Sequence, residues 1–190
     1  MIPENPYESL KNGNFNDVDI LLGYNTNEGT MFVPPSVTEK QIVGLISYLH
    51  KDGDADKINK LYSRETYKNT YDRSCEYIGD IAFNLGMKIF ADNISNKNKV
   101  YMYHFDYAPE YMLRTPYKVG HASEIAYVFN NLQKDASQTQ RQVAAAFHRR
   151  VVTGAIGTTL VSRKVDCIKS KQQLKSAAGQ RWPRWYPELL

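Results

Sequence analysis

A strand pattern followed directly by a carboxylate is the feature that most constrains this chain. Residues 18–23 form a largely apolar run, which is typical of a strand in a parallel sheet that is covered on both faces. The polar stretch Asn25–Thr30 follows at once and contains Glu28. By composition alone this stretch is an ordinary Asn- and Gly-rich turn with a solvated acid. In an open parallel sheet, however, functional groups gather at the carboxyl ends of the strands, and Glu28 is at such an end.

The rest of the chain alternates between helical and extended patterns. Apolar and aromatic alternation predicts a second strand over residues 100–107, with Tyr101, Tyr103, Phe105 and Tyr107 on one side. Thr38 is a predicted N-cap. Helices are predicted over residues 39–49, 54–61, 65–71, 79–91, 123–130 and 138–152. The long crossover between the two strands predicts parallel pairing and an α/β fold.

A histidine follows the second strand at the same predicted edge. The stretch Gly120–Glu124 contains His121, and its glycine lets the backbone approach other groups closely. We expect His50, His104 and His148 to be structural, since a lone histidine is more often a hydrogen-bonding partner than a catalyst. Glu124 is either a helix-start charge, a buried structural partner or a support for the histidine, and Ser123 is a predicted N-cap.

Two stretches carry a family resemblance. They are Leu21–Phe32, which reads Leu-Leu-Gly-Tyr-Asn-Thr-Asn-Glu-Gly-Thr-Met-Phe, and Gly120–Phe129, which reads Gly-His-Ala-Ser-Glu-Ile-Ala-Tyr-Val-Phe. A weaker third is Trp182–Trp185. Together they resemble the C-terminal portion of the type-B carboxylesterases, the cholinesterase-like branch of the α/β-hydrolase fold. The resemblance runs from about residue 2 to 147 and implies a partial fold of few parallel strands with flanking helices, incomplete without the N-terminal half.

The resemblance implies that Glu28 is the acid and His121 the base of a catalytic triad. The nucleophile of this fold lies in a Gly-x-Ser-x-Gly elbow that precedes both, and the sequence contains no such motif. Two hypotheses follow. The chain is part of a serine carboxylesterase that hydrolyses small carboxylic esters only when the N-terminal half is supplied, or it is a non-catalytic binding or adhesion scaffold of cholinesterase-like fold. Whether it is an enzyme by itself stays open.

Other classes of function find little support in the composition. Cys75 and Cys167 lack metal-site spacing, so we expect neither a metal nor a cofactor. No segment approaches the roughly 20 apolar residues that span a bilayer, and residues 1–5 do not resemble a signal peptide. Members of the family are often secreted, so the compartment stays open. We expect the unpaired edge of an incomplete sheet to favour self-association.

The basic charge of the chain is concentrated in its tail. Residues 148–190 hold nine Lys or Arg and two acidic residues, although the whole chain has a formal charge of only +4. No nucleic-acid-binding motif accompanies this charge, so we expect no specific nucleic-acid partner. The sequence therefore predicts an esterase-like domain over residues 1–148 and a divergent, poorly ordered basic tail over 149–190, with a docking segment at 182–187.

Overall fold

The computed structural model of the 190-residue chain describes residues 5–51, 53–63, 65–153 and 165–168. Its elements follow the order α1 (Pro6–Asn12), β1 (Ile20–Asn25), η1 (Glu28–Met31), α2 (Glu39–Leu49), α3 (Ala55–Leu61), α4 (Thr70–Gly79), η2 (Asp80–Asn84), α5 (Leu85–Ile94), β2 (Val100–Phe105), α6 (Glu110–Leu113), α7 (Ile125–Val128), α8 (Gln138–Thr153) and β3 (Val165–Ile168).

The sheet confirms the predicted parallel pair. Its strand order is β1-β2-β3, and β1 runs parallel to β2 in a register that joins Ile20 to Val100 and Asn25 to Phe105. β3 pairs antiparallel with the other side of β2. The expectation of a poorly ordered tail is therefore wrong for residues 165–168, whose backbone groups extend the ladder of β2. The proposed docking segment at 182–187 lies outside the described residues.

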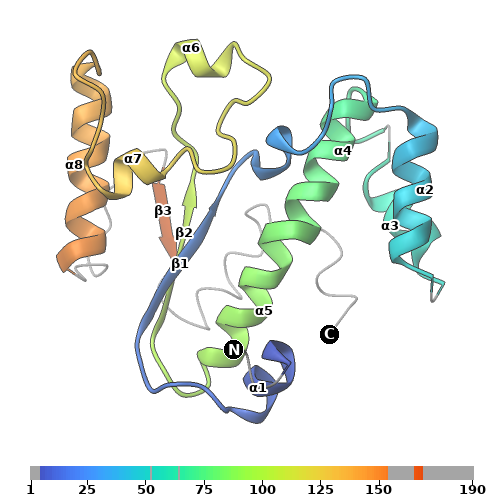
Figure 1. Ribbon diagram of the computed structural model, residues 1–190, viewed down its shortest axis with the longest axis horizontal. Helices are drawn as coiled ribbons and strands as arrows, with labels where there is room; N and C mark the ends of the chain where they lie inside the picture. The colour runs from blue at the N-terminus through green and yellow to red at the C-terminus, as the bar shows by residue number, and fades with distance from the viewer. Residues whose placement is uncertain (1–4, 52, 64, 154–164, 169–190) are drawn as a thin grey trace.

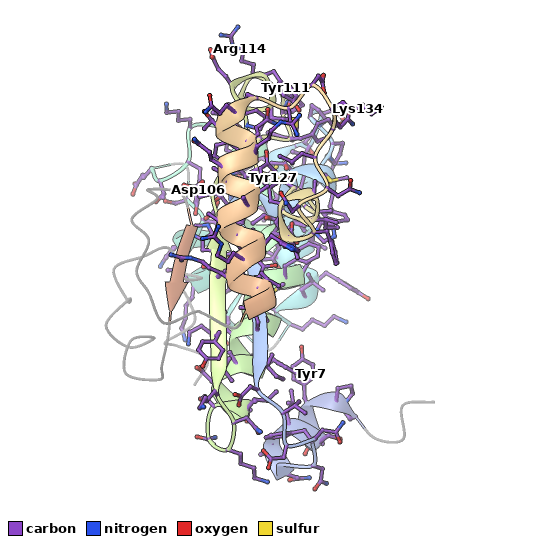
Figure 2. The ribbon with its side chains drawn as sticks, turned by 90° about the vertical axis from the view of Figure 1, so that its left-hand side faces the viewer. Tyr7, Asp106, Tyr111, Arg114, Tyr127 and Lys134 are labelled. Atoms are coloured by element: carbon purple, nitrogen blue, oxygen red, sulfur yellow. The ribbon has the colours of Figure 1, made fainter. Side chains whose placement is uncertain are left out.

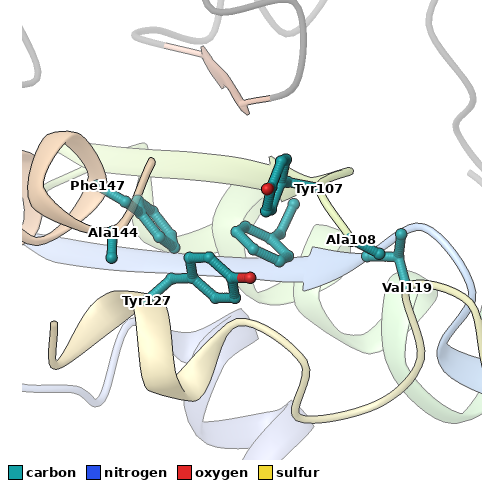
Figure 3. Packing of buried hydrophobic residues seen from close by; sticks show 7 residues of the cluster. Tyr107, Ala108, Val119, Tyr127, Ala144 and Phe147 are labelled. Atoms are coloured by element: carbon teal, nitrogen blue, oxygen red, sulfur yellow. The ribbon is translucent and has the colours of Figure 1, made fainter. Parts of the chain in front are cut away.

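Helices cover both faces of the sheet (Figure 1). One face packs Tyr24 and Met102 against Leu10 of α1 and against Ala91 and Ile94 of α5. The opposite face packs Phe105 against Tyr127, Ala144 and Phe147 from α7 and α8 (Figure 3). Figure 2 shows α8 running alongside the strands, with Tyr127 next to it. The predicted one-sided placement of Tyr103 and Phe105 is confirmed, because both rings contact Phe147.

The long central helix differs from its prediction at the start. No helix spans residues 65–71; instead α4 begins at Thr70, where the Asn69 side chain accepts a hydrogen bond from the Asp72 amide at 2.8 Å. The helical backbone then continues through the π-helical turn η2 into α5 and ends at Ile94. The helices predicted over 65–71 and 79–91 leave out residues 72–78 of α4, because an Asn cap and a polar first turn hide an amphipathic helix.

Two further differences concern the ends of helices. Thr38 is the N-cap of α2, as predicted, and makes a full capping box with Gln41. Ser123 is not an N-cap: it lies in a turn, with its amide donating to the carbonyl of Gly120 at 3.1 Å, and the short α7 begins two residues later. Helix α8 runs through the predicted domain boundary at residue 148 and ends at Thr153.

No helix in the described part of the chain has both the length and the apolar character needed to cross a membrane.

Candidate active site

The acid Glu28 lies in the turn that follows β1. Its side chain is only 4% exposed, and its Oε1 accepts a hydrogen bond from the backbone N–H of Asn25 at 2.7 Å. This bond reverses the chain directly after the strand, so the carboxylate points back toward the strand end. A buried carboxylate with a backbone donor on one oxygen is held in one orientation and keeps its second oxygen for another partner.

That second partner is the imidazole of His121. Its Nδ1 lies 2.7 Å from Glu28 Oε2, across 93 positions of sequence. Because an ionised carboxylate only accepts, Nδ1 donates its proton and the free acceptor of a neutral ring is Nε2. The His121 side chain is 41% exposed, and within the described residues no hydrogen bond to Nε2 is present. The predicted contact between the two residues is therefore confirmed, with the imidazole open on its second nitrogen.

Two aromatic rings hold the imidazole from the sides. Phe32, just after the Glu28 turn, meets the His121 ring edge-on at 5.4 Å between centroids. Phe83 lies closer, at 4.6 Å, and comes from the π-helical turn η2. Such turns within a helix alter which side chains face a given direction and are often found at functional sites. Phe83 lies in the helix predicted over residues 79–91, and helical spacing alone gives no sign of its contact with His121.

The two loops that carry the pair are joined by backbone hydrogen bonds. The amide of Asn27 donates to the carbonyl of Val119 at 2.9 Å, and the amide of Val119 donates to Asn27 Oδ1 at 3.3 Å. The hydroxyl of Thr30 donates to the carbonyl of Tyr117 at 3.0 Å. These bonds place the turn after β1 against the segment before His121, so the distance between the acid and the base depends on the backbone as well as on the side chains.

Close packing explains the glycine beside each residue. A Cβ on Gly29 would lie 1.9 Å from the carbonyl oxygen of Cys75, and a Cβ on Gly120 would lie 2.8 Å from that of Tyr117. Neither glycine has a positive φ, so glycine is required at these two positions because a neighbouring backbone carbonyl lies too close for a Cβ. The strained backbone lies next to His121 instead: Ala122 has a φ of 65°, in the left-handed region that non-glycine residues rarely adopt.

Glu124 supports the acid through Asn25. Its Oε2 accepts a hydrogen bond from the side-chain Nδ2 of Asn25 at 2.5 Å, while the backbone N–H of Asn25 donates to Glu28 Oε1. Of the roles that the sequence left open for Glu124, the structure therefore supports that of a structural partner. Asn25 is fully buried, and within the described residues its Oδ1 has no hydrogen-bond partner. Sequence analysis assigned no role to Asn25, although it opens the motif that contains Glu28.

The other histidines have structural partners, as predicted. His104 Nε2 lies 2.8 Å from Thr26 Oγ1, His50 Nε2 lies 3.1 Å from the Tyr77 hydroxyl, and His148 Nδ1 donates to the carbonyl of Val128 at 2.8 Å. None of these three bonds involves a carboxylate. Among the described residues, Glu28 and His121 therefore form the one histidine–carboxylate pair.

A cavity of about 270 Å³ lies beside Glu28, and His121 is not among the residues that line it. Its walls include Glu28, Cys75, Glu76 and Lys118. Burial raises the pKa of the Cys75 thiol to about 11, so this thiol stays protonated at neutral pH and is a poor nucleophile. The arrangement thus provides an oriented acid and base but no activated nucleophile beside them in the described part of the chain.

Comparison with known proteins agrees with this geometry. Residues 1–154 match the Carboxylesterase family. The para-nitrobenzyl esterase of Bacillus subtilis (strain 168) is 27% identical over 135 residues, which cover 69% of this chain and 26% of that protein. Among solved structures, a PNB esterase superposes with a TM-score of 0.69 at 21% identity, over 92% of this chain and 41% of the esterase. A thermophilic PNB esterase superposes with a TM-score of 0.64.

These matches establish the fold and the family. The chain adopts part of an α/β-hydrolase fold and spans less than half the length of the relatives that it matches. The family match runs to residue 154, six residues beyond the end of the domain predicted from the sequence. The chain belongs to the Carboxylesterase family.

Proposed function

We propose that this chain supplies the acid and the base of a serine carboxylesterase that acts on small carboxylic esters. Glu28 is the triad acid and His121 the general base. The observation that carries the proposal is the 2.7 Å contact between His121 Nδ1 and the buried carboxylate of Glu28, with Nε2 left open. The named activity of the related para-nitrobenzyl esterase supports an ester as the substrate class.

The chemistry follows from the proton positions. Glu28 accepts the Nδ1 proton and so selects the tautomer in which Nε2 can accept a proton from a serine hydroxyl. The serine oxygen then attacks the ester carbonyl, and the imidazolium returns its proton to the departing alcohol. The carboxylate stabilises the imidazolium between these two steps, since the two opposite charges are adjacent and the carboxylate itself is buried.

The nucleophile and the oxyanion-hole donors have to come from outside this sequence, which has no Gly-x-Ser-x-Gly motif. We therefore expect the chain alone to be inactive. The same absence favours a second candidate, a non-catalytic cholinesterase-like scaffold that binds other molecules. The two candidates differ in whether His121 has a role once a serine is supplied.

The test combines this chain with the part of the Bacillus subtilis para-nitrobenzyl esterase that precedes its matched region, expressed either as a separate polypeptide or as a fusion. We expect the chain alone to show neither fluorophosphonate labelling nor hydrolysis of a para-nitrophenyl ester. The completed protein should show labelling and hydrolysis. His121→Ala should abolish hydrolysis, and His148→Gln should not. Hydrolysis that survives His121→Ala would refute the proposal, and a well-folded but inert completed protein would favour the scaffold.

A further inference from the structure

A second cavity lies apart from the candidate active site. It has a volume of about 400 Å³ and lies between the loop that carries α6 and the loop that joins α7 to α8 (Figure 1). Small-molecule sites in proteins span roughly 300–1,000 Å³, so this cavity is large enough to hold a ligand. Glu28 and His121 do not line it, and neither do the two phenylalanines that pack on the imidazole. The chemistry of the acid and base therefore leaves this cavity without a role.

Three tyrosine rings form much of its wall. Tyr107, which follows β2, and Tyr127 of α7 are only 6% and 5% exposed, and their rings meet edge to face at 5.5 Å between centroids (Figure 3). Tyr111 of α6 also lines the cavity but is 66% exposed. Two rings are thus held in place by the core and one lies open to water. A ligand ring that covers the open tyrosine removes apolar surface from water and gains contacts with rings that are already positioned.

The polar groups of the wall are mainly uncharged. The loop between α7 and α8 contributes the carboxamides of Asn131 and Gln133, and α8 contributes that of Gln140. Ser123 adds a hydroxyl from the His121 loop. Carboxamides and hydroxyls both donate and accept hydrogen bonds. The wall can therefore orient a ligand that itself carries a neutral donor or acceptor.

Two charged residues also line the cavity, and neither places a charge inside it. Lys118 Nζ lies 3.8 Å from Asp72 Oδ1, and Asp72 belongs to the wall of the other cavity. Asp135 is exposed, so water and salt screen its carboxylate. An ion entering the cavity would lose its hydration without gaining a paired charge, which is costly. The wall therefore suits an uncharged ligand.

Backbone strain gathers around the same cavity. Among the described residues other than glycine, those with positive φ are Lys118, Ala122 and Asn130, at 50°, 65° and 50°. Lys118 lines the cavity, and the other two directly precede the lining residues Ser123 and Asn131. Strained residues of this kind cluster in segments that bind ligands, where the surrounding structure holds them in place. Residues 118–123 also contain His121, so one loop carries the imidazole and part of this wall.

We propose that the cavity binds an uncharged aromatic compound that carries a carboxamide, carbonyl or hydroxyl group. The ligand ring packs against Tyr107 and Tyr127 and is covered on the outside by Tyr111. Its polar group exchanges hydrogen bonds with the carboxamides of the wall. The bound molecule contacts the His121 loop at Ser123 but takes no part in ester hydrolysis, so the inference stands or falls separately from the proposed function.

The test titrates the full chain with four small probes and follows backbone amide chemical shifts. Benzamide has the ring and a neutral polar group, cyclohexanecarboxamide lacks the aromatic ring, and benzoate and benzylammonium carry opposite charges. Benzamide should bind saturably with a Kd on the order of 1 mM. It should shift the amides of Ser123, Leu132 and Ala136, which line the cavity. The other three probes should bind at least about 3-fold more weakly, because each lacks the ring or has to lose the hydration of a charge.

A pair of tyrosine variants locates the binding. Tyr111→Ala removes an exposed ring from the wall and should weaken benzamide binding by about 3–10-fold. Tyr48→Ala is the matched control, because Tyr48 of α2 is also 66% exposed and does not line the cavity. This control should leave the Kd unchanged.

Three results would overturn the inference. The first is the absence of saturable benzamide binding. The second is binding that Tyr111→Ala and Tyr48→Ala affect equally, or that shifts amides away from the cavity. The third is tighter binding of benzoate, benzylammonium or cyclohexanecarboxamide than of benzamide, because the ligand would then be an ion or an aliphatic compound.

Discussion

Two imidazoles lie near the ends of the same pair of strands and differ in almost every contact. His104 belongs to β2, where its ring stacks on Tyr24 at 4.9 Å and its Nε2 meets the hydroxyl of Thr26. His121 belongs to an irregular turn beyond the strand, where its Nδ1 meets the buried carboxylate of Glu28. Phe32 and Phe83 pack against the His121 ring and leave it 41% exposed.

The difference shows that the hydrogen-bond partner of a histidine and its accessibility to substrate decide what the imidazole can do. A buried carboxylate stabilises an imidazolium, whereas a hydroxyl only fixes the orientation of the ring. A strand position keeps its side chain within the packed layers, whereas a loop beyond the strand end can present it to a substrate. The following predictions test this contrast, beginning with the largest expected effect.

Replacing each histidine in the completed esterase should give kcat/KM values that differ by several orders of magnitude. His121→Ala removes the proposed base and should lower kcat/KM by on the order of 10⁴-fold. His104→Gln keeps a polar group near Thr26 and should change kcat/KM by less than about 10-fold, since it removes no group from the reaction. Equal losses in the two variants, measured with a para-nitrophenyl ester, would remove the distinction.

The turn that holds Glu28 should be sensitive to a single methyl group. Gly29→Ala places a Cβ against the backbone of Cys75, and we expect it to lower the free energy of unfolding by about 1–3 kcal/mol. Gly44→Ala is the matched control, because nothing lies within 4 Å of its Cβ in helix α2. Helix propensity should make that variant more stable by about 0.5–1 kcal/mol. Urea unfolding of the two variants measures the difference, and a neutral Gly29→Ala would contradict the packing described here.

Support of the acid through Asn25 should have a smaller effect on turnover. Glu124→Ala leaves Asn25 Nδ2 buried without its acceptor, so we expect the backbone bond to Glu28 to loosen and kcat to fall by about 10-fold, roughly 1.4 kcal/mol. Glu124→Gln retains an acceptor oxygen and should restore most of the activity. If the two variants are equally impaired, the charge of Glu124 matters rather than its hydrogen bond to Asn25.

The smallest effect concerns Cys75, whose backbone packs against the Glu28 turn. Burial raises its pKa from 9.0 to about 11. Above about pH 9 the native thiol thus keeps a proton that the unfolded chain releases. The contribution of this thiol to the free energy of unfolding is therefore fully present below about pH 9 and is lost as the pH rises toward 11. Cys75→Ala should reduce this alkaline loss. Part of the alkaline loss of stability should remain in the Cys75→Ala variant, because burial also raises the pKa of Tyr77, to about 12.

Urea midpoints at pH 8 and pH 10.5 measure this loss, and iodoacetamide should modify native Cys75 slowly at pH 8. Rapid alkylation at pH 8 would show a reactive thiol beside the acid and reopen the question of the nucleophile.

The sequence was most informative where local rules apply. Apolar runs located β1 and β2, the long crossover predicted their parallel pairing, and the Thr38 cap located α2. Its failures lie where tertiary contacts override those rules. The polar first turn of α4 concealed a helix, the turn at Ser123 shortened α7, and β3 formed in a segment whose composition predicted little order.

The sequence by itself determined which groups are available for chemistry: an acid after one strand, an imidazole after another, and a glycine beside each. These follow from residue type and short-range pattern. Only the tertiary structure decided that Oε1 of Glu28 binds Asn25 while Oε2 binds His121, and that a π-helical turn brings Phe83 to the imidazole. The physical reason is that these contacts join residues far apart in the chain, so their geometry depends on how the strands and loops pack together.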